Sequence, residues 1–186
     1  DGPHLFVIDA RSMTLLKTLT LPAKKLEYLA INPRTHTLYQ NLTDVREIAA
    51  IDSKTLTVKR LIKTPEIVDN HPLIFDAADN ALIDVGENGT LAVYSVQGKL
   101  LHRAAFSGHV DQCAFDSKRR RLACFGSSIV LFKIGIGGAP RFEAKREIAR
   151  GMHTGTIDPA TGIIWAGWPT GSTSVAQAFR VAAAKP

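Results

Sequence analysis

Cysteine is scarce in this sequence, and long apolar runs and familiar catalytic motifs are missing from it. Two cysteines among 186 residues provide neither a disulfide-rich scaffold nor a zinc site with four cysteine ligands. No window approaches the roughly 18 consecutive apolar residues of a transmembrane helix, so we expect no membrane span. The serine-hydrolase motif Gly-x-Ser-x-Gly is also absent from the sequence, which leaves no signature of that enzyme class.

The composition is that of an ordinary globular protein. Hydrophobic residues make up 45% of the chain and charged residues 22%, while 23 Lys and Arg against 17 Asp and Glu give a net charge of +6. A chain of this length buries roughly 70% of the surface that its unfolded form exposes, so it can build a core without metal or disulfide staples. The sequence starts at Asp1 rather than Met, and we therefore expect a processed chain or a piece of a longer one.

Two short patterns recur along the chain with a period of about 40 residues. In the first pattern an apolar segment ends in an acid or amide before a polar turn, and its markers are Asn32, Asp76, Asp116 and Asp158. In the second pattern the apolar segments end at Asp9, Asp52, Ser95 and Lys133. Two independent markers with one period, and four short strands in each unit, are typical of β-propeller blades.

The segments between the markers have the composition of short antiparallel strands. β-Branched and aromatic residues predominate in them, and Asn, Asp, Pro and Gly occupy the turns. Helix propensity is high only in residues 141–150 and 174–184, which are rich in Ala, Glu, Lys and Arg. We expect strands there too, because the repeat requires them. The prediction is an all-β fold: a β-propeller of about four four-stranded antiparallel blades, with about 17 strands in total.

We expect a single propeller segment over residues 1–186. A partial blade covers residues 1–21, three blades cover about 22–64, 65–106 and 107–149, and a second partial blade covers 150–186. An open array of this kind exposes sheet edges and part of the core, which is an aggregation hazard. We therefore expect the segment to belong to a larger ring, completed by preceding blades or by a second copy of the chain.

Three stretches resemble the YVTN/YncE-like bacterial β-propeller repeat family. They are residues 6–9 (Phe-Val-Ile-Asp), residues 47–55 (Glu-Ile-Ala-Ala-Ile-Asp-Ser-Lys-Thr) and residues 108–116 (Gly-His-Val-Asp-Gln-Cys-Ala-Phe-Asp). The resemblance extends over nearly the whole chain and is degenerate within each unit. It implies an exported bacterial propeller, periplasmic or secreted. The Gly108-His109 pair is also similar to WD40 repeats, although the Trp-Asp dipeptide of that family is absent from the sequence.

The candidate binding residues lie just before the first strand of each unit. In a propeller these positions ring one mouth of the central channel, and here they are Glu27, Asn70, His71, His109, Asp111 and His153. Glu27, His71 and His153 each precede a repeat marker by five residues, so we expect them at equivalent places around the channel. Two interpretations stay open: polar side chains solvated at the mouth, or ligands of a divalent metal, since carboxylates and imidazoles bind such ions.

The two cysteines flank the turn that follows Asp116. If Asp116 pairs with Arg121 across this hairpin, Cys113 and Cys124 lie directly opposite each other, with Cα atoms about 4.5 Å apart. A disulfide tolerates that separation, and an exported protein would form one. The alternative is a pair of reduced thiols packed in the core of the blade.

Basic residues cluster at Lys118–Arg121, and the pairs Lys24-Lys25 and Lys145-Arg146 add to the positive charge. Such clusters attract phosphate backbones, but at a hairpin tip solvated charge is the usual occupant. The sequence therefore favours a non-enzymatic binding or scaffold propeller, without a cofactor, that takes a protein or a small molecule at its channel face. The alternatives are a lactonase-like hydrolase with a divalent metal and a nucleic-acid-binding protein with basic loops.

Overall fold

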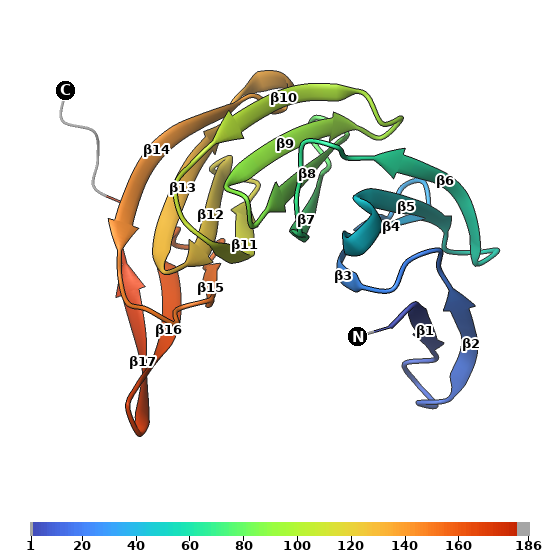
Figure 1. The fold of residues 1–186 in the computed structure, drawn as a ribbon, viewed down its shortest axis with the longest axis horizontal. Coiled ribbons are helices and arrows are strands. Elements are labelled where there is room, and N and C mark those ends of the chain that lie inside the picture. The colour runs from blue at the N-terminus through green and yellow to red at the C-terminus, as the bar shows by residue number, and fades with distance from the viewer. Residues whose placement is uncertain (1, 182–186) are drawn as a thin grey trace.

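The computed structural model describes residues 2–181. Within them the chain forms β-strands and two short 3-10 turns (Figure 1). A two-stranded sheet holds β1 (His4–Ile8) and β2 (Leu15–Thr20). The next sheet holds β3 (Leu26–Asn32), β4 (Thr37–Leu42), β5 (Glu47–Asp52) and β6 (Thr57–Lys63). It is followed by the sheet of β7 (Asn70–Asp76), β8 (Ala81–Gly86), β9 (Thr90–Ser95) and β10 (Leu100–Ala105).

The chain continues into a third four-stranded sheet and a final three-stranded one. The four-stranded sheet holds β11 (Val110–Asp116), β12 (Arg121–Gly126), β13 (Ser128–Ile134) and β14 (Pro140–Glu147). The last holds β15 (Thr154–Ile157), β16 (Ile164–Thr170) and β17 (Thr173–Phe179). Two single 3-10 turns, η1 (Thr43–Val45) and η2 (Ile136–Gly138), interrupt the meander. Within each sheet, strands that are consecutive in sequence pair antiparallel.

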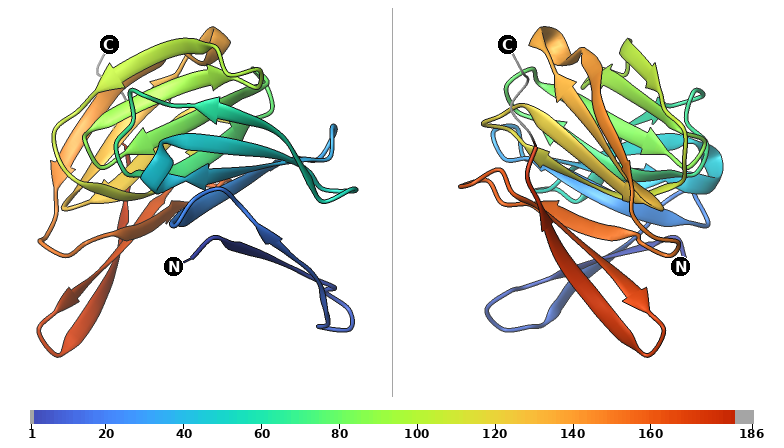
Figure 2. Two further views of the ribbon diagram at one scale, coloured as in Figure 1. Left: turned by 45° about the vertical axis from the view of Figure 1, so that its right-hand side comes forward. Right: turned by 90° about the vertical axis from the view of Figure 1, so that its left-hand side faces the viewer.

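The five sheets follow one another along an arc, with their first strands innermost (Figures 1 and 2). The innermost strands contact one another in order, β3 with β7, β7 with β11, and β11 with β15. The two-stranded and three-stranded sheets stand at the two ends of the arc. This is the β-propeller architecture that the repeat predicts. Residues 140–147 and 173–179 are strands, as the repeat required against their helix propensity; residues 1 and 182–186 of the predicted end units lie outside the described part of the chain.

The repeat markers recur because they close hairpins. The Asp52 carboxylate accepts hydrogen bonds from the backbone N–H groups of Lys54 and Thr55, both at 2.9 Å. Four residues after such a marker the backbone enters the left-handed region, with φ of 53° at His36 and 54° at Leu56. An acceptor on the marker is therefore a local requirement of this turn. Lys133 has no acceptor on its side chain, and its hairpin is closed instead by η2.

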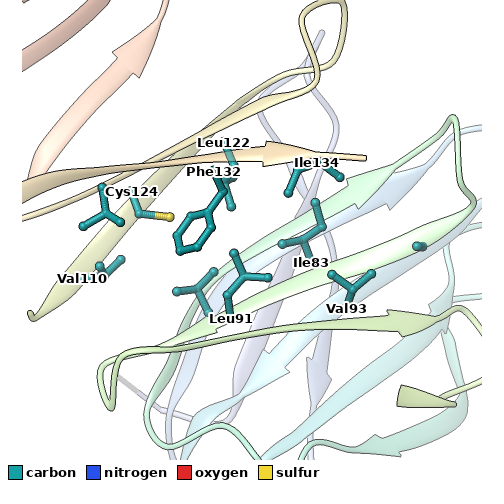
Figure 3. Packing of buried hydrophobic residues seen from close by; sticks show 11 residues of the cluster. Ile83, Leu91, Val93, Val110, Leu122, Cys124, Phe132 and Ile134 are labelled. Carbon is teal, nitrogen blue, oxygen red and sulfur yellow. The ribbon is translucent and has the colours of Figure 1, made fainter. Parts of the chain in front are cut away.

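Adjacent sheets pack face to face through apolar side chains. The cluster between the second and third four-stranded sheets joins Ile83 and Leu91 to Leu122 and Phe132, all fully buried (Figure 3). Separate clusters fill the other gaps between sheets. Burial of such a side chain contributes roughly 1.5–3 kcal/mol to the stability of the folded state. Packing against the neighbouring sheets therefore stabilises each sheet. Large apolar side chains of the first sheet stay exposed, with Phe6 59% and Leu16 62% accessible.

Candidate functional site at the channel mouth

The starts of the innermost strands β3, β7 and β11 and the segment before β15 lie near one another at one mouth of the central channel, and they carry ionisable side chains. His71 lies at the centre of this group, 8% exposed. Its Nε2 atom is 3.6 Å from Glu27 Oε1 and 3.5 Å from Glu87 Oε1, and its Nδ1 atom is 3.4 Å from Asp111 Oδ1. Three sheets thus place a carboxylate around one imidazole. We call this group, together with Lys25, His109 and His153, the channel-mouth cluster.

Carboxylates and imidazoles alternate across the mouth. Glu87 bridges two histidines, since its Oε2 atom is 3.3 Å from His109 Nε2 while Oε1 faces His71. Asp111 does the same on the other side, with Oδ2 3.6 Å from His153 Nδ1. The order across the mouth is therefore His109, Glu87, His71, Asp111, His153. Protonation of an imidazole in this row places positive charge directly beside a carboxylate.

Lys25, which directly precedes β3, has its side chain beside His71. Its ammonium nitrogen is 3.2 Å from His71 Nε2 and 3.4 Å from Glu27 Oε1. An ammonium group only donates hydrogen bonds, so this contact requires His71 Nε2 to act as an acceptor, which is the role it has in the tautomer with its proton on Nδ1. A protonated His71 would instead donate from Nε2 to Glu27 or Glu87 and would repel Lys25.

All but one of the residues predicted from the sequence lie together at the mouth. Glu27, His71, Asp111 and His153 form contacts there, and His109 joins through Glu87. Asn70 does not face the mouth, because its side chain is fully buried beneath it. Glu87 was missed by the sequence analysis because it lies in the turn between β8 and β9 and not ahead of a first strand. The available signal was a single acidic residue in the Glu87-Asn88-Gly89 turn.

A buried polar pair lies behind the mouth, between the first and second four-stranded sheets. Asn41 Nδ2 donates to Asp84 Oδ1 at 3.1 Å and to the carbonyl oxygens of Asn70 and His71 at 3.2 and 3.1 Å. Asn41 and Asp84 are both fully buried. Burial raises the pKa of the Asp84 carboxyl to about 7, although the Asn41 hydrogen bond acts in the opposite direction. The amide of Asn41 thus couples Asp84 to the backbone that carries His71.

A glycine allows the His109 loop to approach the sheet behind it. A Cβ atom on Gly126 would lie 1.7 Å from the His109 carbonyl oxygen and 2.6 Å from its carbonyl carbon. No L side chain fits this contact without moving the loop. Gly126, at the end of β12, therefore allows the backbone of His109 to pack directly against this strand.

Within residues 2–181, no group of three or more His, Cys, Asp or Glu side chains is arranged to hold a metal ion. The mouth residues are close together, but they contact one another as acid–imidazole pairs. The metal-binding interpretation of Glu27, His71 and His153 therefore gains no support from their geometry.

Cys113 and Cys124 are joined by a disulfide, with Cα atoms 4.1 Å apart. They are direct partners in the register of β11 and β12, where Asp116 pairs with Arg121. Cys124 is fully buried in the cluster between sheets. The bond joins β11 to β12, and Cys113 follows Asp111 by two residues on β11.

The basic run is internally paired, contrary to the solvated hairpin tip that we expected. Arg119 donates to Asp116 and to the carbonyl oxygens of Pro159 and Ala160. Arg120 donates to both oxygens of Asp76 at 2.6 Å and to Asp79. Arg121 forms a double contact with Glu143, 2.7 Å at each oxygen. Arg120 therefore fastens this sheet to the preceding one and Arg119 fastens it to the following one, whereas Arg121 and Glu143 lie in the same sheet.

No helix among the described residues is long and apolar enough to cross a membrane. No family model matches the chain, and no curated protein matches it in sequence.

A chain of Kuenenia stuttgartiensis hydrazine synthase is similar in structure, with a TM-score of 0.74 and 12% sequence identity. The similarity covers 91% of this chain and 51% of that one, so this chain spans about half of its structural relative. Since 1152 chains of solved structure match in all, the architecture is widely shared and does not by itself specify an activity. At 12% identity the likeness establishes the fold alone: a segment of an all-β propeller.

Proposed function

We propose that this protein is a non-enzymatic binding propeller that takes its ligand at the channel-mouth cluster. The observation that carries the proposal is the convergence of His71 with Glu27, Glu87 and Asp111, which come from three different sheets and lie within 3.6 Å of its ring nitrogens. Taking these groups from water and holding them together costs free energy. A fold that needed them only for solubility would leave them apart.

A thermal-shift screen of small molecules tests this proposal. The wild-type protein is compared with the double variant Glu87→Gln/Asp111→Asn and with the control Glu147→Gln, whose side chain is 71% exposed on β14. We expect at least one compound that raises the melting temperature of the wild type and of the control and leaves the double variant unchanged. If every stabilising compound acts equally on all three proteins, the ligand site lies elsewhere.

We further propose that the chain is a YVTN/YncE-like propeller exported to the periplasm or secreted. The repeat resemblance supports the family, and the Cys113–Cys124 disulfide supports an oxidising compartment. Fractionation of the producing cells together with thiol counting tests this assignment. Recovery from the cytoplasm with two free thiols would contradict it.

We also propose that the ring is completed, by further blades or by a second copy of the chain. The exposed apolar side chains of the first sheet, together with Trp165 at 45% exposure in the last, support a covered interface at these ends. Light scattering tests the second-copy form of the proposal. A particle of twice the chain mass of 20.2 kDa is expected. A folded monomer at high concentration would contradict completion of the ring by a second copy, and completion by further blades would then be the form of the proposal that remains.

Of the alternatives, the metal-dependent hydrolase lacks a grouped ligand set within residues 2–181. The nucleic-acid alternative required free basic loops, whereas Arg119, Arg120 and Arg121 are engaged with carboxylates. Binding of a protein or small molecule at the mouth therefore has the better support.

A further inference from the structure

The channel mouth is negatively charged although the whole chain is positive. The carboxylates of Glu27, Glu87 and Asp111 oppose the single ammonium of Lys25, which leaves two net negative charges when the histidines are neutral. A second observation agrees with this balance. Burial raises the pKa of the Tyr28 hydroxyl, and the negative charges of Asp111 and Glu27 raise it further. An anionic ligand would meet repulsion at this surface.

Lys25 already shows how the mouth accommodates an amine. Its ammonium group lies between a carboxylate oxygen, Glu27 Oε1, and an imidazole nitrogen, His71 Nε2. On the other side of His71 the same kinds of acceptor recur, a carboxylate from Glu87 or Asp111 beside an exposed imidazole. His109 and His153 are 53% and 63% exposed there. Among the described residues, Glu87 and Asp111 have histidines but no lysine or arginine within ion-pair distance.

Resting on the proposed function, we propose that the channel mouth binds a small organic cation with primary amino groups, seated against Glu87 and Asp111 as Lys25 is seated against Glu27. An ammonium group donates three hydrogen bonds and accepts none, which suits a surface of carboxylate oxygens and neutral imidazoles. The carboxylates are partly exposed, 33% for Glu87 and 32% for Asp111. A ligand can therefore reach them from solvent.

The same geometry makes binding dependent on pH. The charged groups that face His71 are Lys25, Glu27, Glu87 and Asp111, with His109 and His153 one carboxylate away. Imidazoles ordinarily gain a proton between about pH 8 and pH 5. With His71, His109 and His153 all protonated, the two net negative charges become one net positive charge. The carboxylates are then satisfied internally, and an amine is repelled.

Calorimetric titration with putrescine, a diamine, tests the proposal on the intact chain. Its neutral analogue 1,4-butanediol is the control ligand. We expect putrescine to bind the wild type at about pH 8 and to lose at least about tenfold in affinity at about pH 5.5. Glu87→Gln and Asp111→Asn are each expected to weaken binding by about tenfold, while Glu147→Gln binds as the wild type does. Circular dichroism of each variant verifies that it is folded. Butanediol is expected not to bind.

Succinate and Zn²⁺ serve as further probes that separate this inference from the proposed function. If putrescine fails to bind and one of these probes binds in a way that Glu87→Gln abolishes, the amine is the wrong ligand class and the mouth remains the site. Equal binding of putrescine to all variants places the cation elsewhere and also overturns the inference. If no probe, and no compound in the thermal-shift screen, responds to the mouth substitutions, both the inference and the proposed function fail.

Discussion

The buried carboxyl group of Asp84 gives the protein a pH dependence that a single substitution can remove. Burial raises its pKa from 3.8 to about 7. Between these two values the folded protein holds a proton that the unfolded chain has released, so the free energy of unfolding falls as the pH rises from about 4 to about 7. Above pH 7 both states are ionised, and this dependence ends.

Asp84→Asn keeps an oxygen for Asn41 and has no charge to bury. We expect it to stabilise the protein at pH 8 by on the order of 1–3 kcal/mol and to flatten the decline between about pH 4 and 7. Urea unfolding at several pH values measures both effects. Asp84→Ala is the control, because it leaves the Asn41 amide without its carboxylate and is expected to destabilise at every pH. A wild-type protein whose stability does not change over this range would contradict the argument.

The left-handed turn positions give a second prediction for single residues. His36 is exposed and has φ of 53°, a conformation that costs an L residue about 1–2 kcal/mol and costs glycine nothing. His36→Gly is therefore expected to be neutral or stabilising. Arg34→Gly, two residues earlier in the same turn, is expected to lose about 0.5–1 kcal/mol. Thermal unfolding of the two variants tests the difference, and equal losses would contradict it.

At the scale of elements, the arginine contacts act as fasteners between sheets. Arg120 joins the β11–β12 hairpin to Asp76, a buried carboxylate of the preceding sheet that is 1% exposed. Removing one partner of such a pair leaves an unpaired buried charge. We expect Arg120→Ala to destabilise the protein by about 2–4 kcal/mol. Arg34→Ala, in the corresponding hairpin of an earlier sheet, is the control. A loss under about 0.5 kcal/mol for Arg120→Ala would mean that solvent screens the pair.

The disulfide fastens one blade internally. Cys113 and Cys124 are separated by 11 residues in sequence, and closing a loop of this size stabilises by about 2–3 kcal/mol in the chain-entropy model. A reductant is therefore expected to lower the melting temperature of the wild type. It is expected to have no effect on Cys113→Ala/Cys124→Ala. Two reactive thiols in protein kept free of reductant would show that the bond does not form.

The elements were more predictable from the sequence than the contacts between them. Asn32, Asp76, Asp116 and Asp158 mark local turns, so their spacing already gave the strand order and the cysteine register. Glu27, His71, Asp111 and His153 could be placed at one mouth for the same reason, because repeat phase fixes position around a ring. Glu87 and the Asn41–Asp84 pair could not be found this way, since their contacts join side chains from different sheets. The Arg120–Asp76 ion pair and the contacts of Arg119 with Pro159 and Ala160 depend on the same long-range packing.

At the scale of the whole molecule, the fold is a propeller segment, and the proposed ligand site lies where its innermost strands begin. The innermost strands bring the channel-mouth cluster together at one end, while the marker hairpins lie at the opposite ends of the same strands. The structural relative, at 12% identity, shares the scaffold and gives no information on these side chains. The location of the ligand is therefore the central claim.

Amide chemical-shift mapping by NMR with a compound from the screen tests that claim most directly. The account predicts shifts at the starts of β3, β7, β11 and β15, in the Glu87 turn and at His109. It predicts no change in the hairpins of Asn32, Asp76, Asp116 and Asp158. Shifts confined to those hairpins, or to the apolar pocket lined by Ile129, Leu131 and Phe179, would contradict it.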